Sequence, residues 1–109
     1  MTPIVRLSIL RCPPERFAEC SRVMAEFEGV LRPGIQAMPG LIAYYAGTDE
    51  ATSSLHNTSV WDTLEHAKQM DTFQPMLDSA KHFVALGVTF ERPIMNYGTL
   101  WQFTGPGAG

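Results

Sequence analysis

Proline and glycine pairs divide this chain into segments with two different hydrophobic periodicities. Residues 4–10 alternate between two faces, which is typical of a β-strand, and the Pro-Pro pair at 13–14 ends them. In residues 15–32 the apolar side chains recur every three or four positions, as in an amphipathic helix. The Pro-Gly pair at 33–34 is expected to end this helix. The chain therefore opens with a strand followed by a helix.

Two further strands are expected to follow as a hairpin. A Met-Pro-Gly turn at 38–40 precedes the apolar run at 41–46, which is typical of a buried strand. A polar loop then leads to residues 55–61, a second strand-like run. The loop is a little longer than most hairpin loops, but the two runs still read as partners.

Helical periodicity returns in the second half of the chain. Asp62 and Glu65 have the three-residue spacing of a capping box and predict a short helix. Asp71 is expected to cap a second helix, and Gly87 is suited to its C-terminal end.

The last strand is predicted at residues 88–103, where Pro93 either kinks it or marks an edge. The order strand-helix-strand-strand-helix-strand predicts an α+β chain with a ferredoxin-like βαββαβ fold. In that fold a four-stranded antiparallel sheet carries its helices on one face. We expect a single domain at 1–104 and a flexible tail at 105–109.

Charge is scarce for a chain of this length. Only 17% of the 109 residues are charged, against about 25% in typical soluble domains. The predicted strands contain almost no charge apart from Arg6 and Glu91, so the sheet lacks a polar face suited to water. Both faces should therefore be buried, and a homodimer that packs sheet against sheet is expected.

The composition also excludes several classes of function. Eight basic and eleven acidic residues give a net charge of −3 with no basic run, which argues against nucleic-acid or anionic-membrane binding. No apolar run reaches the roughly 20 residues of a membrane helix, and no signal peptide is recognisable. Cys12 and Cys20 match no metal pattern. We expect reduced thiols, no metal site and a cytoplasmic location.

Several local strings are similar to one family. They are Met-Pro-Gly-Leu at 38–41, Val-Trp-Asp-Thr-Leu-Glu at 60–65 and Leu-Trp at 100–101. With the order of elements, they make residues 3–103 resemble the antibiotic biosynthesis monooxygenase branch of the dimeric α+β-barrel superfamily. The resemblance implies a ferredoxin-like chain that pairs into a barrel.

Some members of that branch oxidise electron-rich polycyclic phenols with dioxygen and without metal, flavin or haem. The resemblance implies a dry apolar pocket whose polar groups favour loss of a phenolic or enolic proton, and no cofactor. Anthrone-type oxygenases of the branch carry an Asn and a Trp four residues apart, the spacing of Asn57 and Trp61 here. Ala67 stands where those enzymes have a Tyr, and Lys81 and His82 lie near the place of their Arg.

Haem-degrading relatives form a second branch with a different set of residues. They carry an Asn on the first strand, a Trp in the short helix and a His that ligates iron. This chain has Leu7 or Ser8, then Ala67 and Leu77, at the corresponding places. Because the axial His is missing, haem binding is not expected.

Each candidate residue also has a structural interpretation. Trp61 fits a core position as well as a pocket wall. Asn57 is unusual within a strand and needs a polar partner if it is buried. His82 suits the end of a helix electrostatically, and it would be the best general base in the chain if it turned inward. Lys81 is expected to be a solvated surface charge.

The other histidines and the tyrosines complete the candidate set. His56 should point to the face opposite Asn57, toward a partner subunit, and His66 fits an exposed helix position. Tyr44 and Tyr45 occupy opposite faces of their strand, so that one of them can face the helices and donate to a phenolic oxygen.

These patterns favour a cofactor-free monooxygenase-like protein that acts on a small aromatic or quinol-type substrate. Asn57, Trp61 and Lys81 would bind the substrate, while His82 or Tyr44 would handle the proton. The alternative is a dimeric module that binds or senses a small molecule without turnover. A third possibility is a purely structural dimer whose pocket is filled by its own side chains.

Overall fold

A computed structural model describes residues 2–108 of the chain. Met1 and Gly109, which belong to the predicted domain and to the predicted tail, lie outside them. The strands are β1 (Ile4–Arg11), β2 (Leu41–Asp49), β3 (Ser54–Trp61), β4 (Thr89–Phe90) and β5 (Met95–Gly98). The helices are α1 (Phe17–Glu26), α2 (Glu28–Gln36), α3 (Leu64–Ala67) and α4 (Gln74–Ala85), with the 3-10 turns η1 (Pro14–Arg16), η2 (Lys68–Thr72) and η3 (Pro106–Ala108).

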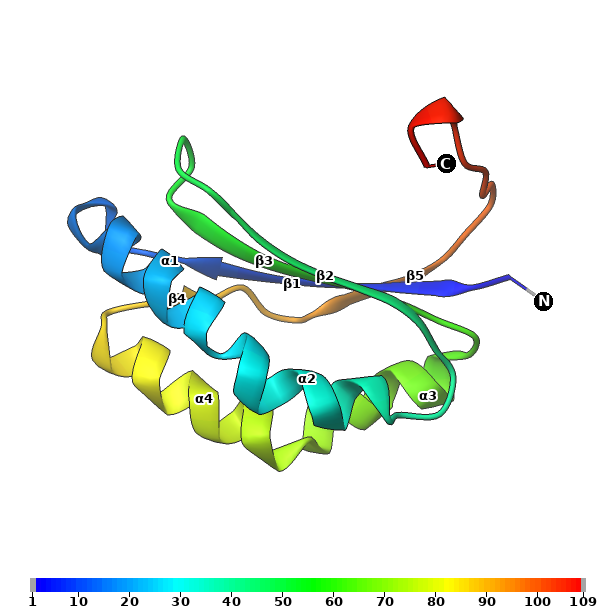
Figure 1. Cartoon of the computed structure of the whole chain (residues 1–109), viewed down its shortest axis with the longest axis horizontal. Helices are drawn as coiled ribbons and strands as arrows, with labels where there is room; N and C mark the ends of the chain where they lie inside the picture. The colour runs from blue at the N-terminus through cyan, green and yellow to red at the C-terminus, as the bar shows by residue number, and fades with distance from the viewer. Residues whose placement is uncertain (1, 109) are drawn as a thin grey trace.

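The described strands form one antiparallel sheet in the order β2-β3-β1, and both β4 and β5 pair with β1. The helices lie on one side of this sheet and leave its other side open (Figure 1). This arrangement confirms the predicted α+β fold with a ferredoxin-like chain order, with the last strand split into two. Within residues 2–108, no helix is both long and apolar enough to cross a membrane.

The strand register decides which side chains face the helices. Directly paired residues share a face of the sheet. Leu10 pairs with Leu55, and both lie in a core cluster with Phe83 of α4, so this row faces the helices. The residues of this covered face on β1 and β3 are Ile4, Arg6, Ser8, Leu10, Leu55, Asn57, Ser59 and Trp61. Arg6 is therefore enclosed between the sheet and the helices.

The open face is the side of the sheet without helices. The same register assigns to it the uncharged residues Val5, Leu7, Ile9, Tyr45, His56, Thr58, Val60, Met95 and Tyr97. The charged residues Arg11 and Asp49, which both pair with Ser54, lie at one end of this face. Tyr45, Met95 and Tyr97 are among the exposed large side chains of the molecule. The predicted shortage of charge on the second face of the sheet is thus found in the fold.

Two apolar clusters hold the helices against the covered face. One joins Cys20 of α1 to Leu55 and Phe83, and the other surrounds Trp61 with Ile35 and its neighbours. Burial of each large side chain contributes about 1.5–3 kcal/mol to folding. Cys12 and Cys20 are free and buried in the first cluster, as expected of reduced thiols. Burial, with a smaller effect of Cys20, raises the pKa of the Cys12 thiol to about 11.

The predicted end of the first helix at Pro33 is wrong. The helix breaks at Phe27, whose carbonyl accepts hydrogen bonds from the amides of Val30 (3.1 Å) and Leu31 (2.9 Å). The second part, α2, then continues through Pro33. A proline inside a helix costs about 3 kcal/mol. Here the helix continues because Ile35, beyond the proline, is buried in the cluster around Trp61.

Both predicted aspartate caps are wrong. Thr63 is the N-cap of α3, and its Oγ1 accepts the His66 amide at 3.1 Å. Asp62 instead lies 2.7 Å from His66 Nδ1, and this hydrogen bond lowers the pKa of the Asp62 carboxyl. Phe73 occupies the N-cap of α4. Asp71, which was the expected cap there, has a tertiary partner described below.

The last predicted strand is interrupted, as the prediction of a kink at Pro93 anticipated. Residues 91–94 separate β4 from β5 and contain a cis Arg92–Pro93 peptide bond. The chain leaves the sheet after Gly98 and extends away from the body of the molecule (Figure 1). Leu100 is 94% exposed and Trp101 81% exposed. The predicted strand thus ends five residues too late, because its last apolar residues contact little of their own chain.

Candidate functional site

A cleft of about 1120 Å³ lies between the covered face of the sheet and the helices. Most of its wall is apolar, from β2 and from the facing sides of α1, α2 and α4. Its aliphatic and aromatic lining includes Leu10, Met24, Phe27, Leu31, Ile35, Leu41, Ala43, Met70, Met76, Leu77, Phe83 and Phe90. The polar groups on its sheet side are Arg6, Ser8, Tyr44, Tyr45, Thr48, Asn57, Ser59 and Arg92, and those on its helix side are Ser21, Glu28, Arg32, Gln36, Asp71 and Ser79. A mainly apolar cleft that also holds polar groups is typical of a ligand site.

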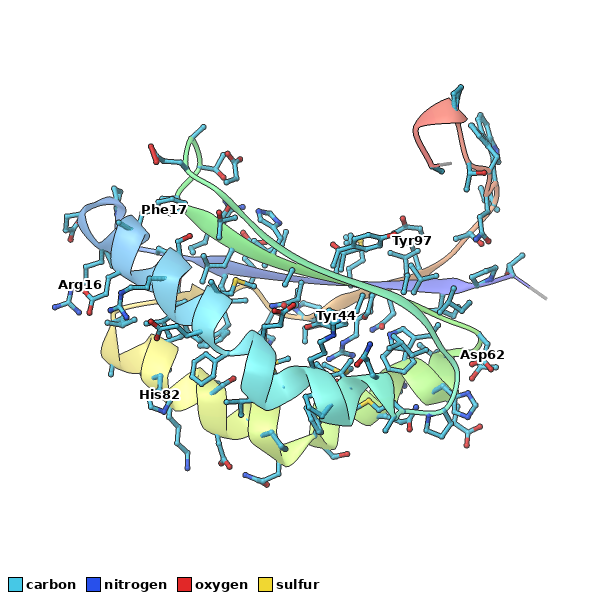
Figure 2. The ribbon with its side chains drawn as sticks, in the orientation of Figure 1. Arg16, Phe17, Tyr44, Asp62, His82 and Tyr97 are labelled. Carbon is cyan, nitrogen blue, oxygen red and sulfur yellow. The ribbon has the colours of Figure 1, made fainter. Side chains whose placement is uncertain are left out.

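Tyr44 and Asn57 form a hydrogen-bonded pair in this cleft. They come from the adjacent strands β2 and β3, and the Tyr44 hydroxyl donates to Asn57 Oδ1 at 2.9 Å. Figure 2 shows Tyr44 on the helix side of the sheet and Tyr97 on the opposite side. Because Asn57 Oδ1 accepts from Tyr44, its amide group remains a donor for a ligand.

Tyr44 is a hydrogen-bond donor and not a base at neutral pH. Burial raises the pKa of its phenol to about 12, although the positive charge of Arg6 acts in the opposite direction. The protonated phenol is therefore the form present in the folded protein over the physiological range. The expectation that one of the two tyrosines faces the helices is confirmed for Tyr44, and Tyr45 lies on the open face.

Arg6 and Asp71 form an ion pair that sequence reasoning missed. Arg6 Nη2 lies 2.8 Å from Asp71 Oδ1, and both residues line the cleft. The Arg6 side chain is 7% exposed, whereas that of Asp71 is 50% exposed. The alternation of β1 places Arg6 on the same face as Leu10, but it does not show that the helices cover this face. The sequence did not indicate that Asp71 forms an ion pair, since an aspartate before a helix is typical of an N-cap.

Trp61 belongs to the core. Its side chain has no exposed surface, and its indole Nε1–H donates to Ser59 Oγ at 2.8 Å. The cleft lining includes Asn57 but not Trp61, although both lie on the covered face. The structure therefore brings together Asn57 and Tyr44, while Trp61 supports the wall behind them.

His82 and Lys81 lie on the outer side of α4. His82 is exposed, and its ring packs edge-on against Phe27 with 5.4 Å between the ring centres. Figure 2 shows it directed away from the sheet. Lys81 is exposed and 4.0 Å from Asp78. Neither residue is part of the cleft lining. Helical geometry explains this, because α4 turns Ser79 and Phe83 inward.

The remaining histidines have structural partners. His56 lies on the open face, as expected, and its Nε2 is 2.7 Å from Ser54 Oγ. His66 is held by Asp62 at the start of α3. Within residues 2–108, no group of three or more His, Cys, Asp or Glu side chains is placed to hold a metal ion.

Solved structures with the same fold include several named as candidate antibiotic biosynthesis monooxygenases. One from Deinococcus radiodurans is 17% identical with a TM-score of 0.69, and the match covers 94% of this chain and 99% of that chain. One from Chloroflexus aurantiacus is 16% identical with a TM-score of 0.60, over 94% of this chain and 98% of that chain. A protein of unknown function from Nitrosomonas europaea is 16% identical with a TM-score of 0.69, over 96% of each chain.

No protein-family model and no curated protein sequence matches this chain. The three solved structures nevertheless match 94–96% of it, so the predicted resemblance is confirmed at the level of the fold. At such low identity, the fold is all that these structures establish, because one fold serves many chemistries.

Proposed function

We propose that this protein is a cofactor-independent monooxygenase-like enzyme that oxidises a small electron-rich phenol or quinol-type substrate with dioxygen. The hydrogen-bonded pair of Tyr44 and Asn57 inside an apolar cleft carries this proposal. The candidate monooxygenase names of proteins with the same fold agree with it.

The proposed reaction requires only a few groups from the protein. An activated methylene flanked by aromatic rings loses a proton, and the resulting anion reduces dioxygen. One oxygen atom then becomes a carbonyl at that carbon and the other leaves as water, so that CH₂ and O₂ give C=O and H₂O. The Asn57 amide N–H, with its side chain oriented by the hydrogen bond from Tyr44, would hold the substrate oxygen on which negative charge develops. The apolar wall would exclude water from the anion.

Oxygen consumption tests this proposal. Purified protein is mixed with anthrones and hydroquinones in an oxygen-electrode cell, and the rate is compared with the uncatalysed oxidation. Tyr44→Phe should lower the catalysed rate about a hundredfold, because it removes the hydrogen bond that orients the Asn57 amide toward the developing oxyanion. Tyr97→Phe is the matched control, since Tyr97 lies on the open face, does not line the cleft and should keep the wild-type rate. Uncatalysed rates with every substrate would contradict the proposal.

A binding or sensing module without turnover is the second candidate. It is favoured by the position of His82 outside the cleft and by the protonated state of Tyr44. The carboxylates on the cleft wall, Asp71 and Glu28, are both paired with arginines. Calorimetry separates the two candidates. Saturable binding of a phenol that depends on Asn57, without oxygen consumption, would identify a binding module.

We also propose that two copies associate through their open faces. Exposed Tyr45, Met95 and Tyr97 surround an apolar centre on that face. Leu100 and Trp101 continue beyond the sheet as exposed apolar residues of the C-terminal segment. An apolar sheet face of this kind is stable in water when a partner covers it. A second copy offers a matching apolar face of the same kind.

A further inference from the structure

We propose that Arg6 is an anion-binding residue of the cleft, and that the natural ligand presents a negatively charged oxygen to its guanidinium. This inference rests on the proposed function for the position of the ligand, and it adds the charge of the ligand and the residue that recognises it. The anionic oxygen is either a phenolate or a carboxylate, which share the chemistry that Arg6 can bind.

The burial of Arg6 gives the first reason. A guanidinium that is 7% exposed has lost most of its water, which is costly unless acceptors replace it. Arg6 has five N–H donors, and the hydrogen bond found for its side chain within residues 2–108 uses one of them, to Asp71 Oδ1. Arg6 lines the cleft, so donors remain for an acceptor that enters it.

The strand register gives the second reason. Tyr44 pairs with Ser59, Ser59 with Arg6 and Arg6 with Asn96, so four polar side chains form one row across the covered face. Adjacent strands lie about 4.8 Å apart, which places the backbones of Tyr44 and Arg6 about 10 Å apart. An aromatic ring with oxygens at both ends fits between two such anchors. The ring would receive a cation from Arg6 at one end, and a hydroxyl at its other end would donate to the Tyr44 oxygen, whose own proton goes to Asn57.

Asn96 gives the third reason. Its Oδ1 is buried and has no hydrogen-bond partner among the described residues, although it is the direct cross-strand neighbour of Arg6. Asn96 Oδ1, the acceptor on the neighbouring strand, thus forms no hydrogen bond with the Arg6 guanidinium. Buried polar groups without partners are uncommon in folded proteins, and they mark places where another molecule belongs.

Asp71 acts as a resident counter-ion that an anionic ligand must displace or share. Its carboxylate is half exposed, so water can replace Arg6 as its partner when a ligand arrives. A neutral ligand would leave the ion pair intact and gain nothing from Arg6. The site therefore selects for an anion, and Asp71 weakens that selection by competing with the anion.

Equilibrium binding of small aromatic probes tests this inference. 4-Nitrophenol reports the phenolate arm, because its anion absorbs visible light and the pKa of the bound molecule can be titrated. Benzoate reports the carboxylate arm, and 4-nitroanisole is the neutral comparison. Charge-assisted hydrogen bonds are strong enough that Arg6→Gln should weaken binding of the recognised anion by about tenfold to a hundredfold. Binding of 4-nitroanisole should change less than threefold.

Arg11→Gln is the matched control. Arg11 lies on the same strand, and the change alters the net charge equally, but its partner Glu91 is exposed and away from the cleft lining. Arg11→Gln should leave binding of all three probes unchanged. Loss of only nitrophenolate binding in Arg6→Gln identifies a phenolate ligand, and loss of only benzoate binding a carboxylate. Unchanged binding of both anions would overturn the inference.

Asp71→Asn keeps the test decisive if Arg6→Gln does not fold. Removal of the competing carboxylate should tighten binding of the recognised anion about tenfold and leave 4-nitroanisole unchanged. A purely structural Arg6–Asp71 pair predicts equal or weaker anion binding, and that result would overturn the inference. These measurements need no turnover. Arg6-dependent anion binding without oxygen consumption would therefore contradict only the proposed enzyme activity. Oxygen consumption together with anion binding that does not depend on Arg6 would contradict only this inference.

Discussion

The two faces of the sheet reverse the usual distribution of polar and apolar residues. The covered face, which the helices shield from water, holds Arg6, Tyr44, Asn57 and Ser59 along the cleft. The open face, which the helices leave to solvent, is uncharged along residues 5–9 of β1 and along β3 and β5, and it exposes Tyr97 among other large side chains (Figure 2). Stability of the single chain explains neither arrangement. The polar groups on the covered face support the proposed ligand site, and the exposed apolar groups on the open face support the proposed contact with a second copy.

The largest expected effect comes from a charge on the open face. Leu7 lies on the central strand β1 of that face, between Thr58 and Met95. If two copies pack there, Leu7→Lys buries an unpaired ammonium and should weaken association by more than about a hundredfold. Sedimentation equilibrium measures this change. Ala18→Lys adds the same charge to an exposed position of α1 and should leave association unchanged. A monomeric wild-type protein at micromolar concentration would refute the dimer itself.

The next effect concerns the phenol on the covered face. The pKa of Tyr44 is raised from 10 to about 12, so the unfolded chain releases this proton at lower pH than the folded chain. Stability due to the buried neutral phenol is complete below pH 10 and is lost as the pH rises toward 12, by about 2–3 kcal/mol. Denaturant titrations at several alkaline pH values should show this loss in the wild-type protein and not in Tyr44→Phe. Equal losses in both proteins would mean that Tyr44 is not buried.

The smallest expected effect separates the core from the cleft within the covered face. Trp61→Phe removes volume and a hydrogen bond from a fully buried site, and it should lower the free energy of unfolding by about 1–3 kcal/mol. Its affinity for aromatic ligands should stay within about threefold of wild type, because Trp61 does not line the cleft. Asn57→Ala should do the reverse, with weaker ligand binding and a smaller loss of stability. A large loss of ligand affinity in Trp61→Phe would show that Trp61 contributes to the binding site after all.

Much of the fold was predictable because it follows from local patterns. Alternation located β1, a continuous apolar run located β2, and β3 was predicted as its hairpin partner, so that the order of the elements indicated the ferredoxin-like arrangement. The errors came where tertiary contacts outweighed a local rule. The burial of Ile35 stabilises α2 beyond Pro33, where a local rule predicts its end. Asp71, which the capping rule assigned to the start of α4, instead forms an ion pair with Arg6.

The candidate site was predictable only in part. Tyr44 and Asn57 were singled out, and the strand register brings them into contact across β2 and β3. His82 and Lys81 were singled out from their place in a family pattern, but α4 turns them outward. Arg6 was visible in the sequence as a charge on a strand. Its burial depended on which face of β1 the helices cover, and a sequence cannot specify this for a sheet that is apolar on both sides.

The sequence by itself determined the order of the elements, the single α+β unit and the shortage of charge on the sheet, because periodicity and composition are local properties. Only the tertiary structure decided which face the helices cover, and with it which polar residues line the cleft. That choice depends on packing between segments far apart in the chain: Leu10 and Leu55 against Phe83, and Arg6 opposite Asp71. The polar row at the cleft is thus a product of strand register, which no single segment encodes.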